Sequence, residues 1–196
     1  VIGALPQDFS FRGERSEVLI GENNIIRENV IINRATHEGC QTVIGNSNML
    51  MEGVHISHDT KIGDYNVFGY GTKIAGDCEI GKGVIFSSSV IENSGTRVGD
   101  LAMLQAGTRF SKDVPPYVIA GGNPIEYGGP NNTLMETWKI DEKVRRHVAN
   151  AYRLLFHSKN SVFDCMLQIK DQVPDGEQVR NIIKFLDETK VGIISK

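Results

Sequence analysis

Two histidines and an aspartate stand close together near the middle of the chain. His55 and His58 are three residues apart, and Asp59 follows His58 directly. A histidine beside a carboxylate can act as a general base, because its ordinary pKa lies near neutrality and the carboxylate can orient the ring or raise its basicity. A solvated surface histidine is the plainer interpretation of His58, and the residues by themselves leave both open.

The same pair of histidines could also suggest a zinc site, since imidazole is a common zinc ligand. The pair lacks a clear third ligand, because the other histidines fall in predicted loops or helices: His37, His147 and His157. The three cysteines are widely scattered and form no Cys-x-x-Cys pair. We therefore expect no metal and no other cofactor, and a reducing cytoplasm as the simplest location.

The residues around the histidine pair repeat with a period of six. Positions counted in steps of six from Ile20 to Phe110 are large and apolar in fourteen of sixteen cases, the exceptions being Glu38 and Glu92. A chain that is 40% hydrophobic would give about six by chance. Two positions earlier in each hexad the residue is small, β-branched or asparagine. Because residues i and i+2 of a strand point to the same side, each hexad predicts a very short strand with one large and one small side chain turned inward.

Tight corners must separate such short strands. Glycine, at 21 of 196 residues, often follows the large residue and is predicted at these corners: Gly21, Gly39, Gly45, Gly63, Gly69, Gly81 and Gly99. Three hexads close a triangular coil of about 18 residues, and stacked coils form a parallel β-helix. Residues 6–15 and 36–41 lack the hexad chemistry, so we predict loops there that leave the prism, a common place for functional residues.

The hexads stop after Phe110, and a stretch rich in glycine and proline follows. We therefore assign residues 1–122 to the β-helix and residues 123–196 to a small C-terminal α-helical domain. Asp141 and Ser161 are predicted to cap two helices, and a third is predicted after Gly176. The fold class is thus mainly β with helices at the C-terminal end.

Charge and hydropathy exclude two classes of function. The chain has 21 Lys and Arg against 24 Asp and Glu, a net charge of −3, which argues against a nucleic-acid binder with a broad basic face. No apolar run approaches the roughly 20 residues that a membrane-spanning helix needs.

Several longer motifs resemble one family of enzymes. They are Pro6-Gln7-Asp8 and the segments 26–30, 51–59, 113–120 and 150–153. With these motifs nearly the whole chain resembles the acyl-(acyl-carrier-protein)–UDP-N-acetylglucosamine O-acyltransferases, which open lipid A synthesis. The resemblance implies a left-handed parallel β-helix, a homotrimer and active sites in the clefts between neighbouring prisms. Family members usually start several coils earlier, so we expect the given sequence to lack N-terminal coils.

The resemblance also implies roles for individual residues. His58 matches the general base that takes the proton from a sugar 3-hydroxyl, which attacks the thioester of the acyl carrier protein. Asp59 matches the residue that supports the base, and the backbone N–H of Gly76 matches the donor to the thioester oxygen. The matches to substrate contacts are Gln7 and Asp8 for the sugar nucleotide, His55 beside the base, Asn131 on the nucleotide side, and Ala106 as the position that measures the acyl chain. Met103 would pack near that chain or simply fill a gap.

Four positions depart from the family pattern. Ser10, Asp77, Asn93 and Thr137 stand where the family has a lysine, two histidines and an arginine. Fewer positive charges near a diphosphate predict weaker binding of it. A divergent, non-catalytic paralogue that binds a sugar nucleotide or carrier protein on the same trimeric scaffold is therefore the main alternative, and a metal-dependent β-helix hydratase is a third.

A basic group is predicted on the first long helix: Lys143, Arg145, Arg146 and Arg153. It is either a solvated helix face or a docking surface for an acidic acyl carrier protein.

Overall fold

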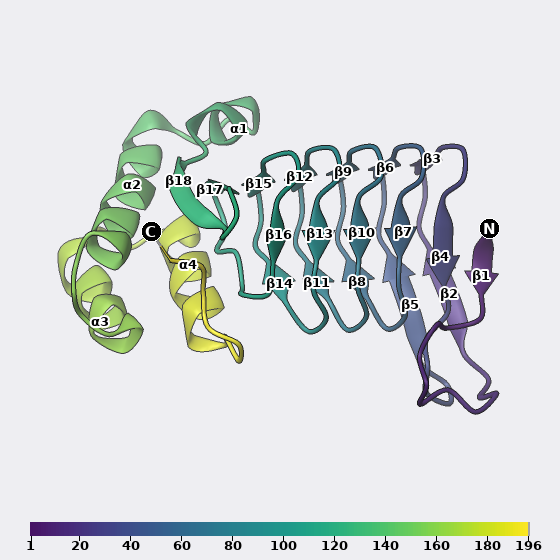
Figure 1. The fold of residues 1–196 in the computed structure, drawn as a ribbon. Helices are drawn as coiled ribbons and strands as arrows, with labels where there is room; N and C mark the ends of the chain where they lie inside the picture. The colour runs from purple at the N-terminus through teal and green to yellow at the C-terminus, as the bar shows by residue number, and fades with distance from the viewer. Residues whose placement is uncertain (196) are drawn as a thin grey trace.

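The computed structural model describes residues 1–195 and consists of a three-sided prism of short strands followed by a group of helices (Figure 1). Sheet A contains β1 (Ile2–Ala4), β4 (Ile31–Asn33), β7 (His55–Ile56), β10 (Lys73–Ile74), β13 (Ile91–Glu92) and β16 (Arg109–Phe110). Sheet B contains β2 (Glu17–Ile20), β5 (Gln41–Ile44), β8 (Lys61–Ile62), β11 (Glu79–Ile80) and β14 (Arg97–Val98). Sheet C contains β3 (Ile25–Ile26), β6 (Met49–Leu50), β9 (Val67–Phe68), β12 (Ile85–Phe86), β15 (Met103–Leu104), β17 (Val118–Gly121) and β18 (Glu126–Pro130).

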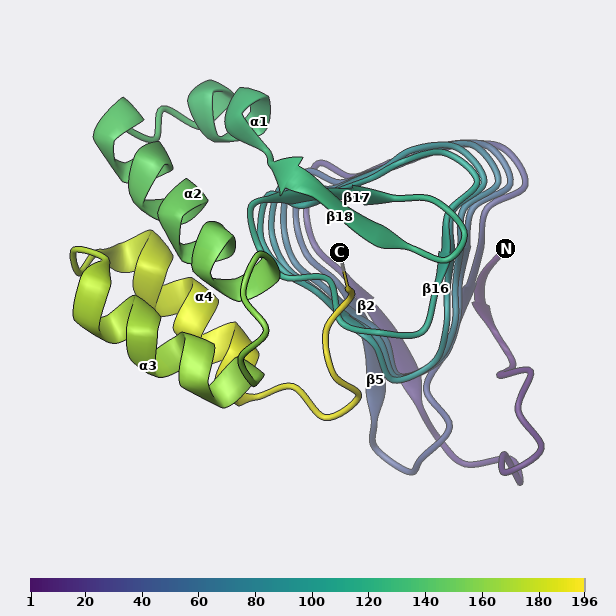
Figure 2. The same cartoon turned by 60° about the vertical axis from the view of Figure 1, so that its left-hand side comes forward.

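The chain visits the three sheets in turn, so each coil stacks on the one before it. Neighbouring strands of the prism pair in parallel, and large inward residues meet in register, as Ile56 does with Ile74. From Ile44 to Phe110 every position of the six-residue phase is at most 4% exposed. The view along the prism shows the resulting triangular section (Figure 2). The predicted parallel β-helix is confirmed, and Glu38, the first exception to the phase, lies exposed in a loop.

The corners contain glycine for two different physical reasons. A Cβ on Gly45 would lie only 2.7 Å from the carbonyl oxygen of Gly63 in the next coil. The residue that follows every strand of sheet B is glycine, because the coils approach closely at this corner. The left-handed turn comes two residues later, as at Gly71, and Asp59 adopts it with φ 58°. The predicted glycines therefore lie at the corners as expected, and of the seven only Gly39, in a loop, has a positive φ.

The C-terminal part begins with a strand and continues with α1 (Asn132–Thr137), α2 (Glu142–Phe156), α3 (Val162–Gln172) and α4 (Glu177–Asp187). β17 extends the prism to Gly121, and β18 folds back antiparallel to it, so the region after residue 122 is not wholly helical. The predicted caps are confirmed: Asp141 accepts from the Lys143 N–H, and Ser161 accepts from the Asp164 N–H. Helix α1 was not predicted, because only Met135 of its six residues is buried and no apolar period marks it.

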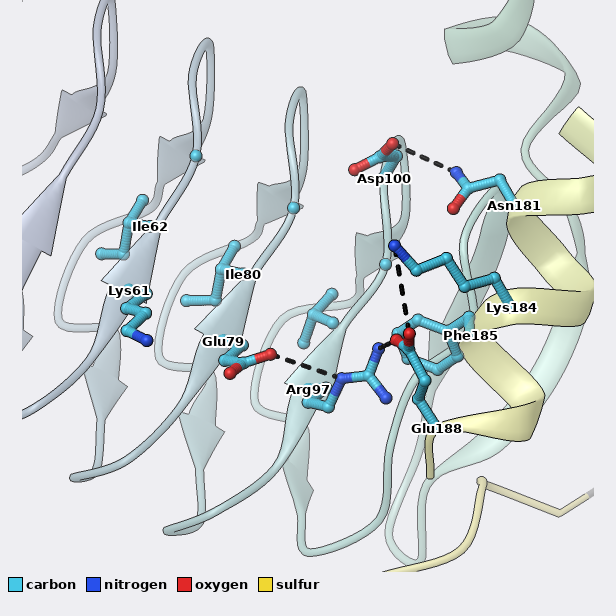
Figure 3. Close-up of a pocket in the computed structure, with 14 residues that line it drawn as sticks. Lys61, Ile62, Glu79, Ile80, Arg97, Asp100, Asn181, Lys184, Phe185 and Glu188 are labelled. Atoms are coloured by element: carbon cyan, nitrogen blue, oxygen red, sulfur yellow. Dashed lines mark hydrogen bonds and ion pairs between the residues drawn. The ribbon is translucent and has the colours of Figure 1, made fainter. Parts of the chain in front are cut away.

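Three kinds of contact fix the helices to the prism. Buried Tyr152 of α2 donates its hydroxyl hydrogen to the Pro116 carbonyl. A groove of about 460 Å³ separates α4 from sheet B, and there Arg97 pairs with Glu79 and Glu188 (Figure 3). The C-terminal segment returns across the last coil, where Asp113 bridges to Ile193 (Figure 2). Within residues 1–195, no helix is both long and apolar enough to cross a membrane.

A buried carboxyl group interrupts the apolar core. Glu92 occupies a large inward position of β13 and is 1% exposed. Its Oε1 accepts from the Thr96 hydroxyl at 3.0 Å, whereas its Oε2 has no partner within the described residues 1–195. Burial raises the pKa of Glu92 well above its ordinary value, outweighing the hydrogen bonds from Thr96 and Cys78, while the charge of Asp113 raises it further. The folded chain therefore favours the protonated acid.

Glu92 predicts a specific pH dependence of stability. Unfolding lets Glu92 ionise with an ordinary pKa near 4.5, so its contribution is fully present below that pH and declines by about 1 kcal/mol per pH unit as the pH rises toward the folded-state pKa. Glu92→Gln removes the titration. We therefore expect the free energy of unfolding of the variant, relative to wild type, to increase between about pH 5 and pH 7. Denaturant titrations at fixed protein concentration measure it.

The matched control is Glu52→Gln, which changes an exposed glutamate of the same prism. Its pH profile should follow wild type. Parallel profiles for wild type and Glu92→Gln would show that Glu92 is ionised in the folded chain.

Candidate active site

The candidate base lies on the column of corners that joins sheet A to sheet B. His58 follows β7 on this column, and the two loops predicted to leave the prism follow β1 and β4 at the same corner, over residues 5–16 and 34–40. The prism therefore places both loops beside His58. Its ring is largely covered, and the residue is 9% exposed.

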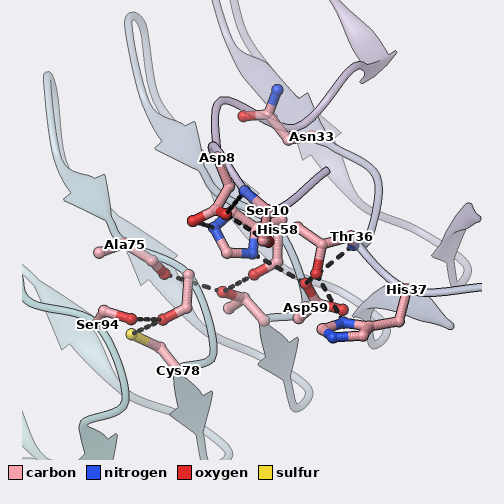
Figure 4. A network of polar contacts seen from close by, with 12 residues as sticks. Asp8, Ser10, Asn33, Thr36, His37, His58, Asp59, Ala75, Cys78 and Ser94 are labelled. Carbon is pink, nitrogen blue, oxygen red and sulfur yellow. Dashed lines mark hydrogen bonds and ion pairs between the residues drawn. The ribbon is translucent and has the colours of Figure 1, made fainter. Parts of the chain in front are cut away.

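Asp59 holds one side of the His58 ring. The Nδ1 of His58 lies 2.9 Å from the Asp59 Oδ2 (Figure 4). An ionised carboxylate can only accept, so the neutral ring carries its hydrogen on Nδ1 and leaves Nε2 free to take a proton. This is the arrangement that a general base requires.

Thr36 in turn holds the Asp59 carboxylate. The Thr36 N–H and hydroxyl both donate to the Asp59 Oδ2, at 3.0 and 2.7 Å, and the Asp59 N–H donates to the Thr42 hydroxyl at 2.9 Å. Burial alone would raise the pKa of Asp59, but the hydrogen bonds from Thr36 and His58 outweigh it and lower the pKa overall. Asp59 therefore stays ionised beside the base.

A second carboxylate faces the other side of the ring. The Oδ2 of Asp8, in the 5–16 loop, lies 3.6 Å from the His58 Nε2. Ser10 donates to the Asp8 Oδ1 from its N–H at 2.7 Å and from its hydroxyl at 2.5 Å, and these bonds lower the pKa of Asp8. Ser10, noted in the sequence only as the loss of a lysine, thus orients Asp8.

Gly76 lies against the His58 ring from the next coil. A Cβ at this position would come within 2.3 Å of the His58 Cε1, so only glycine leaves room for the ring. The Gly76 N–H makes no hydrogen bond within residues 1–195. Its carbonyl is fixed by the Ser94 hydroxyl at 2.7 Å and by the Gly95 N–H at 3.1 Å. A free, rigid N–H donor therefore stands beside the base.

His55 connects the prism to the 5–16 loop. Its Nε2 lies 2.5 Å from the Asn33 Oδ1, and the Asn33 amide donates to the Leu5 carbonyl at 2.7 Å. Burial, followed by the charge of Lys73, lowers the pKa of His55. A neutral ring that donates from Nε2 to Asn33 fits this arrangement. Gln7 lies exposed in the same loop as Asp8.

The remaining predicted residues lie away from the base. Met103 is half-buried on the outer face of sheet C, and Ala106 is exposed at the corner that follows it. Asn131 is 2% exposed and caps α1, accepting from the Leu134 N–H while its amide donates to the Leu101 carbonyl. Both ends of this amide are used within the chain, and its nucleotide contact stays a prediction.

The departures from the family pattern divide between the corner column and the helical part. Asp77 and Asn93 lie on the same column as His58, and the Asp77 N–H donates to the His58 carbonyl at 3.1 Å. Thr137 lies in α1, where its hydroxyl donates to the Thr133 carbonyl. Within residues 1–195, no group of three potential ligands is placed to hold a metal ion.

Thr36 is the residue at the site that the sequence did not reveal. The sequence placed it at a small inward position of a hexad and at the start of the predicted 36–41 loop, and gave no contact for it. The signal lay in the register: Ile32 pairs with Ile56, which sets the corner after β4 beside the corner that carries Asp59. The sequence alone does not give this register, because it depends on how many residues of the 34–40 loop lie outside the prism.

Comparison with known proteins identifies the family. Residues 113–194 match the family described as Udp N-acetylglucosamine O-acyltransferase, Domain 2, and residues 41–76 match the bacterial transferase hexapeptide repeat. The acyl-(acyl-carrier-protein)–UDP-N-acetylglucosamine O-acyltransferase of Xylella fastidiosa is 34% identical over 188 residues, which are 95% of this chain and 72% of that protein. The chain belongs to this family.

Solved structures of the acyltransferase family agree. The UDP-N-acetylglucosamine acyltransferase of Bacteroides fragilis superimposes with a TM-score of 0.96 at 42% identity, over 99% of this chain and 76% of that one. The Acinetobacter baumannii structure gives a TM-score of 0.95 at 31% identity, also over 99% and 76%. The prism is thus a left-handed parallel β-helix, as the resemblance implied.

Gly76→Ala tests the packing of the base. Gly76 has no positive φ, so alanine fits the backbone, but its Cβ would lie 2.5 Å from the His58 Nε2 and push the ring off Asp59. We expect acyl-transfer kcat to fall by about 100-fold, the scale of a misplacement near 1 Å, with little change in melting temperature. Gly176→Ala, with nothing within 4 Å of its Cβ, is the control. Wild-type kcat in Gly76→Ala would show that the ring is not fixed at this position.

Proposed function

We propose that this chain transfers a 3-hydroxyacyl group from acyl carrier protein to the 3-hydroxyl of UDP-N-acetylglucosamine, or of a related nucleotide sugar, early in lipid A synthesis. Family membership supports the reaction class. The observation that carries the proposal is the His58 ring, held through Nδ1 by Asp59, with Nε2 free beside the unbonded N–H of Gly76.

The proposed reaction is a single acyl transfer in which His58 takes one proton from the acceptor hydroxyl and later gives it to the departing sulfur. The acceptor hydroxyl gives its proton to Nε2 while its oxygen bonds to the thioester carbonyl carbon. The carbon–sulfur bond then breaks, and the departing sulfur takes the proton back from Nε2. Asp59 stabilises the imidazolium between these steps, and the Gly76 N–H donates to the carbonyl oxygen as negative charge develops there. We propose no metal or other cofactor, because each bond change is balanced by these groups.

The acceptor sugar would lie between His58 and the 5–16 loop. Asp8 is exposed, ionised and aimed at Nε2, so it can accept a hydrogen bond from a second sugar hydroxyl or amide. Gln7 would contact the same sugar nucleotide. The acyl chain would run toward the corner with Ala106, whose small side chain leaves room for a long chain, beside Met103.

The outer faces of the prism support assembly into a homotrimer. Sheet C turns an apolar row outward: Ile25, Met49, Val67, Ile85, Met103 and Ile119. Sheet B turns mostly polar residues outward, among them Glu17, Gln41, Lys61 and Glu79. A monomer rarely exposes an apolar row along its whole length, and a face that meets a different face of the next copy closes a ring. We propose that the row on sheet C packs against the next prism of the trimer.

Two residues of the basic group would attract the acidic carrier protein. Arg145 pairs with Glu136, and Arg146 pairs with Glu142. Lys143 and Arg153 have no ion pair within residues 1–195, which leaves their charge for a partner. We place the protein in the cytoplasm, which suits an exposed free thiol at Cys40.

His58→Ala tests the chemistry. General-base catalysis contributes about 10²- to 10⁴-fold, so we expect a loss of that size in kcat, with a smaller loss for Asp59→Asn. Mass spectrometry of products from a panel of acyl-carrier thioesters and UDP-sugars measures it, with His147→Ala, on α2, as the control. Unchanged turnover in His58→Ala would reject the assignment of the base. Wild type that binds UDP-N-acetylglucosamine but makes no product would instead support the non-catalytic alternative.

Ile85→Glu tests the trimer. A charge in the middle of the sheet C row would have to be buried without a partner, so we expect monomers in place of trimers by sedimentation velocity. Leu19→Glu makes the same change on the outer face of sheet B, where Leu19 is 52% exposed, and should leave the assembly unchanged. A monomeric wild type, or a trimeric Ile85→Glu, would contradict the proposed interface.

A further inference from the structure

A line of hydrogen bonds leads from the base to a surface histidine that has no role in the reaction described above. His37 is exposed in the 34–40 loop, and its Nδ1 lies 2.8 Å from the Thr36 hydroxyl oxygen (Figure 4). The Thr36 hydroxyl lies 2.7 Å from the Asp59 Oδ2, which lies 2.9 Å from the His58 Nδ1. His37, Thr36, Asp59 and His58 therefore form one connected series.

The chemistry of the groups fixes the direction of each bond. Asp59 is ionised and can only accept, so the single hydroxyl hydrogen of Thr36 points to Asp59. The Thr36 oxygen can then only accept from His37, which requires that His37 carry a hydrogen on Nδ1. In the neutral His37 ring Nε2 then carries no hydrogen, whereas the neutral His55 ring carries its hydrogen on Nε2. Hydrogen bonds in such a series polarise and strengthen one another.

We propose that His37 is a positioning residue for the catalytic base. Its Nδ1–H fixes the rotation of the Thr36 hydroxyl toward Asp59, and Asp59 so held keeps the His58 ring oriented. The Thr36 N–H is fixed by the backbone, whereas the hydroxyl hydrogen is free to rotate unless another group occupies its oxygen. This inference rests on the proposed function, in which His58 acts as the base.

Two carboxylates near His37 accept hydrogen bonds from other groups. Glu38, next in the chain, accepts from the Arg15 N–H at 2.8 Å. Asp8 is held by Ser10, and the charge of His37 is the last of the contributions that lower the pKa of Asp8. Within residues 1–195, the hydrogen bond of the His37 ring is the one with Thr36.

Two pairs of variants test the role of His37 in the trimeric enzyme. His37→Val and Thr36→Val each break the series. His37→Val removes one neutral hydrogen bond, so we expect kcat to fall about fivefold, whereas Thr36→Val removes a bond to the ionised Asp59 and should lower kcat by about tenfold or more, with KM for the nucleotide sugar unchanged in both. His37→Asn places an amide N–H close to the position of Nδ1, and Thr36→Ser retains the hydroxyl, so both should recover most of the lost kcat. Equal losses in His37→Val and His37→Asn, or a change confined to KM, would overturn the proposal in favour of a role in loop folding.

A spectroscopic experiment distinguishes a failure of this proposal from a failure of the proposed function. Nitrogen NMR of histidine-labelled protein, at a pH where the rings are neutral, should show the Nδ1–H tautomer for His37 in wild type and the Nε2–H tautomer in Thr36→Val. An Nε2–H tautomer in wild type would overturn the proposal even if acyl transfer is found. The Nδ1–H tautomer in a protein that transfers no acyl group would refute the proposed function and leave the hydrogen-bond series intact.

Discussion

The whole structure depends on the parallel pairing of each short strand with the strand one coil away. Backbone hydrogen bonds hold neighbouring strands about 4.8 Å apart, so whatever occupies a position in one coil must tolerate its counterpart in the next. Inside the prism this requirement stacks apolar residues on apolar residues, as with the rings of Phe68 and Phe86, whose centroids are 4.9 Å apart. At the corners it excludes a Cβ at Gly45.

The close approach of neighbouring coils also shapes the candidate site. His58 extends from its corner into the space that a side chain at Gly76 would otherwise occupy, so the close stacking of coils becomes a clamp on the ring. The loops that cover the ring leave the prism at the same column of corners. A repeating scaffold is rigid and offers few clefts. In this chain the candidate site forms where two consecutive coils depart from the repeat and their loops cover the corner of the next coil, which carries His58.

Much of the fold could be read from the sequence because the period is short and recurs many times, so occasional exceptions such as Glu38 do not obscure it. The pair His58 and Asp59 was visible for a similar reason, since the two residues are adjacent in the chain. Thr36 was not visible, because its contact with Asp59 depends on how many residues the 34–40 loop removes from the prism. The contact of Ser10 with Asp8 was not visible, because a comparison of residue types records a lost charge and shows no hydrogen bond of the folded chain. Glu92 interrupted the phase in the sequence, but only burial shows that it stays inside the core.

The end of the prism has a consequence for solubility. A stack of parallel coils is in principle unlimited, because its last coil presents unpaired backbone groups on which another chain could continue, as in a growing fibril. Here β18 reverses direction against β17, and the returning C-terminal segment bridges to Asp113 and Glu126 across the same end. The C-terminal part of the chain is therefore also a terminator, which prevents a fold made of identical steps from polymerising at that end.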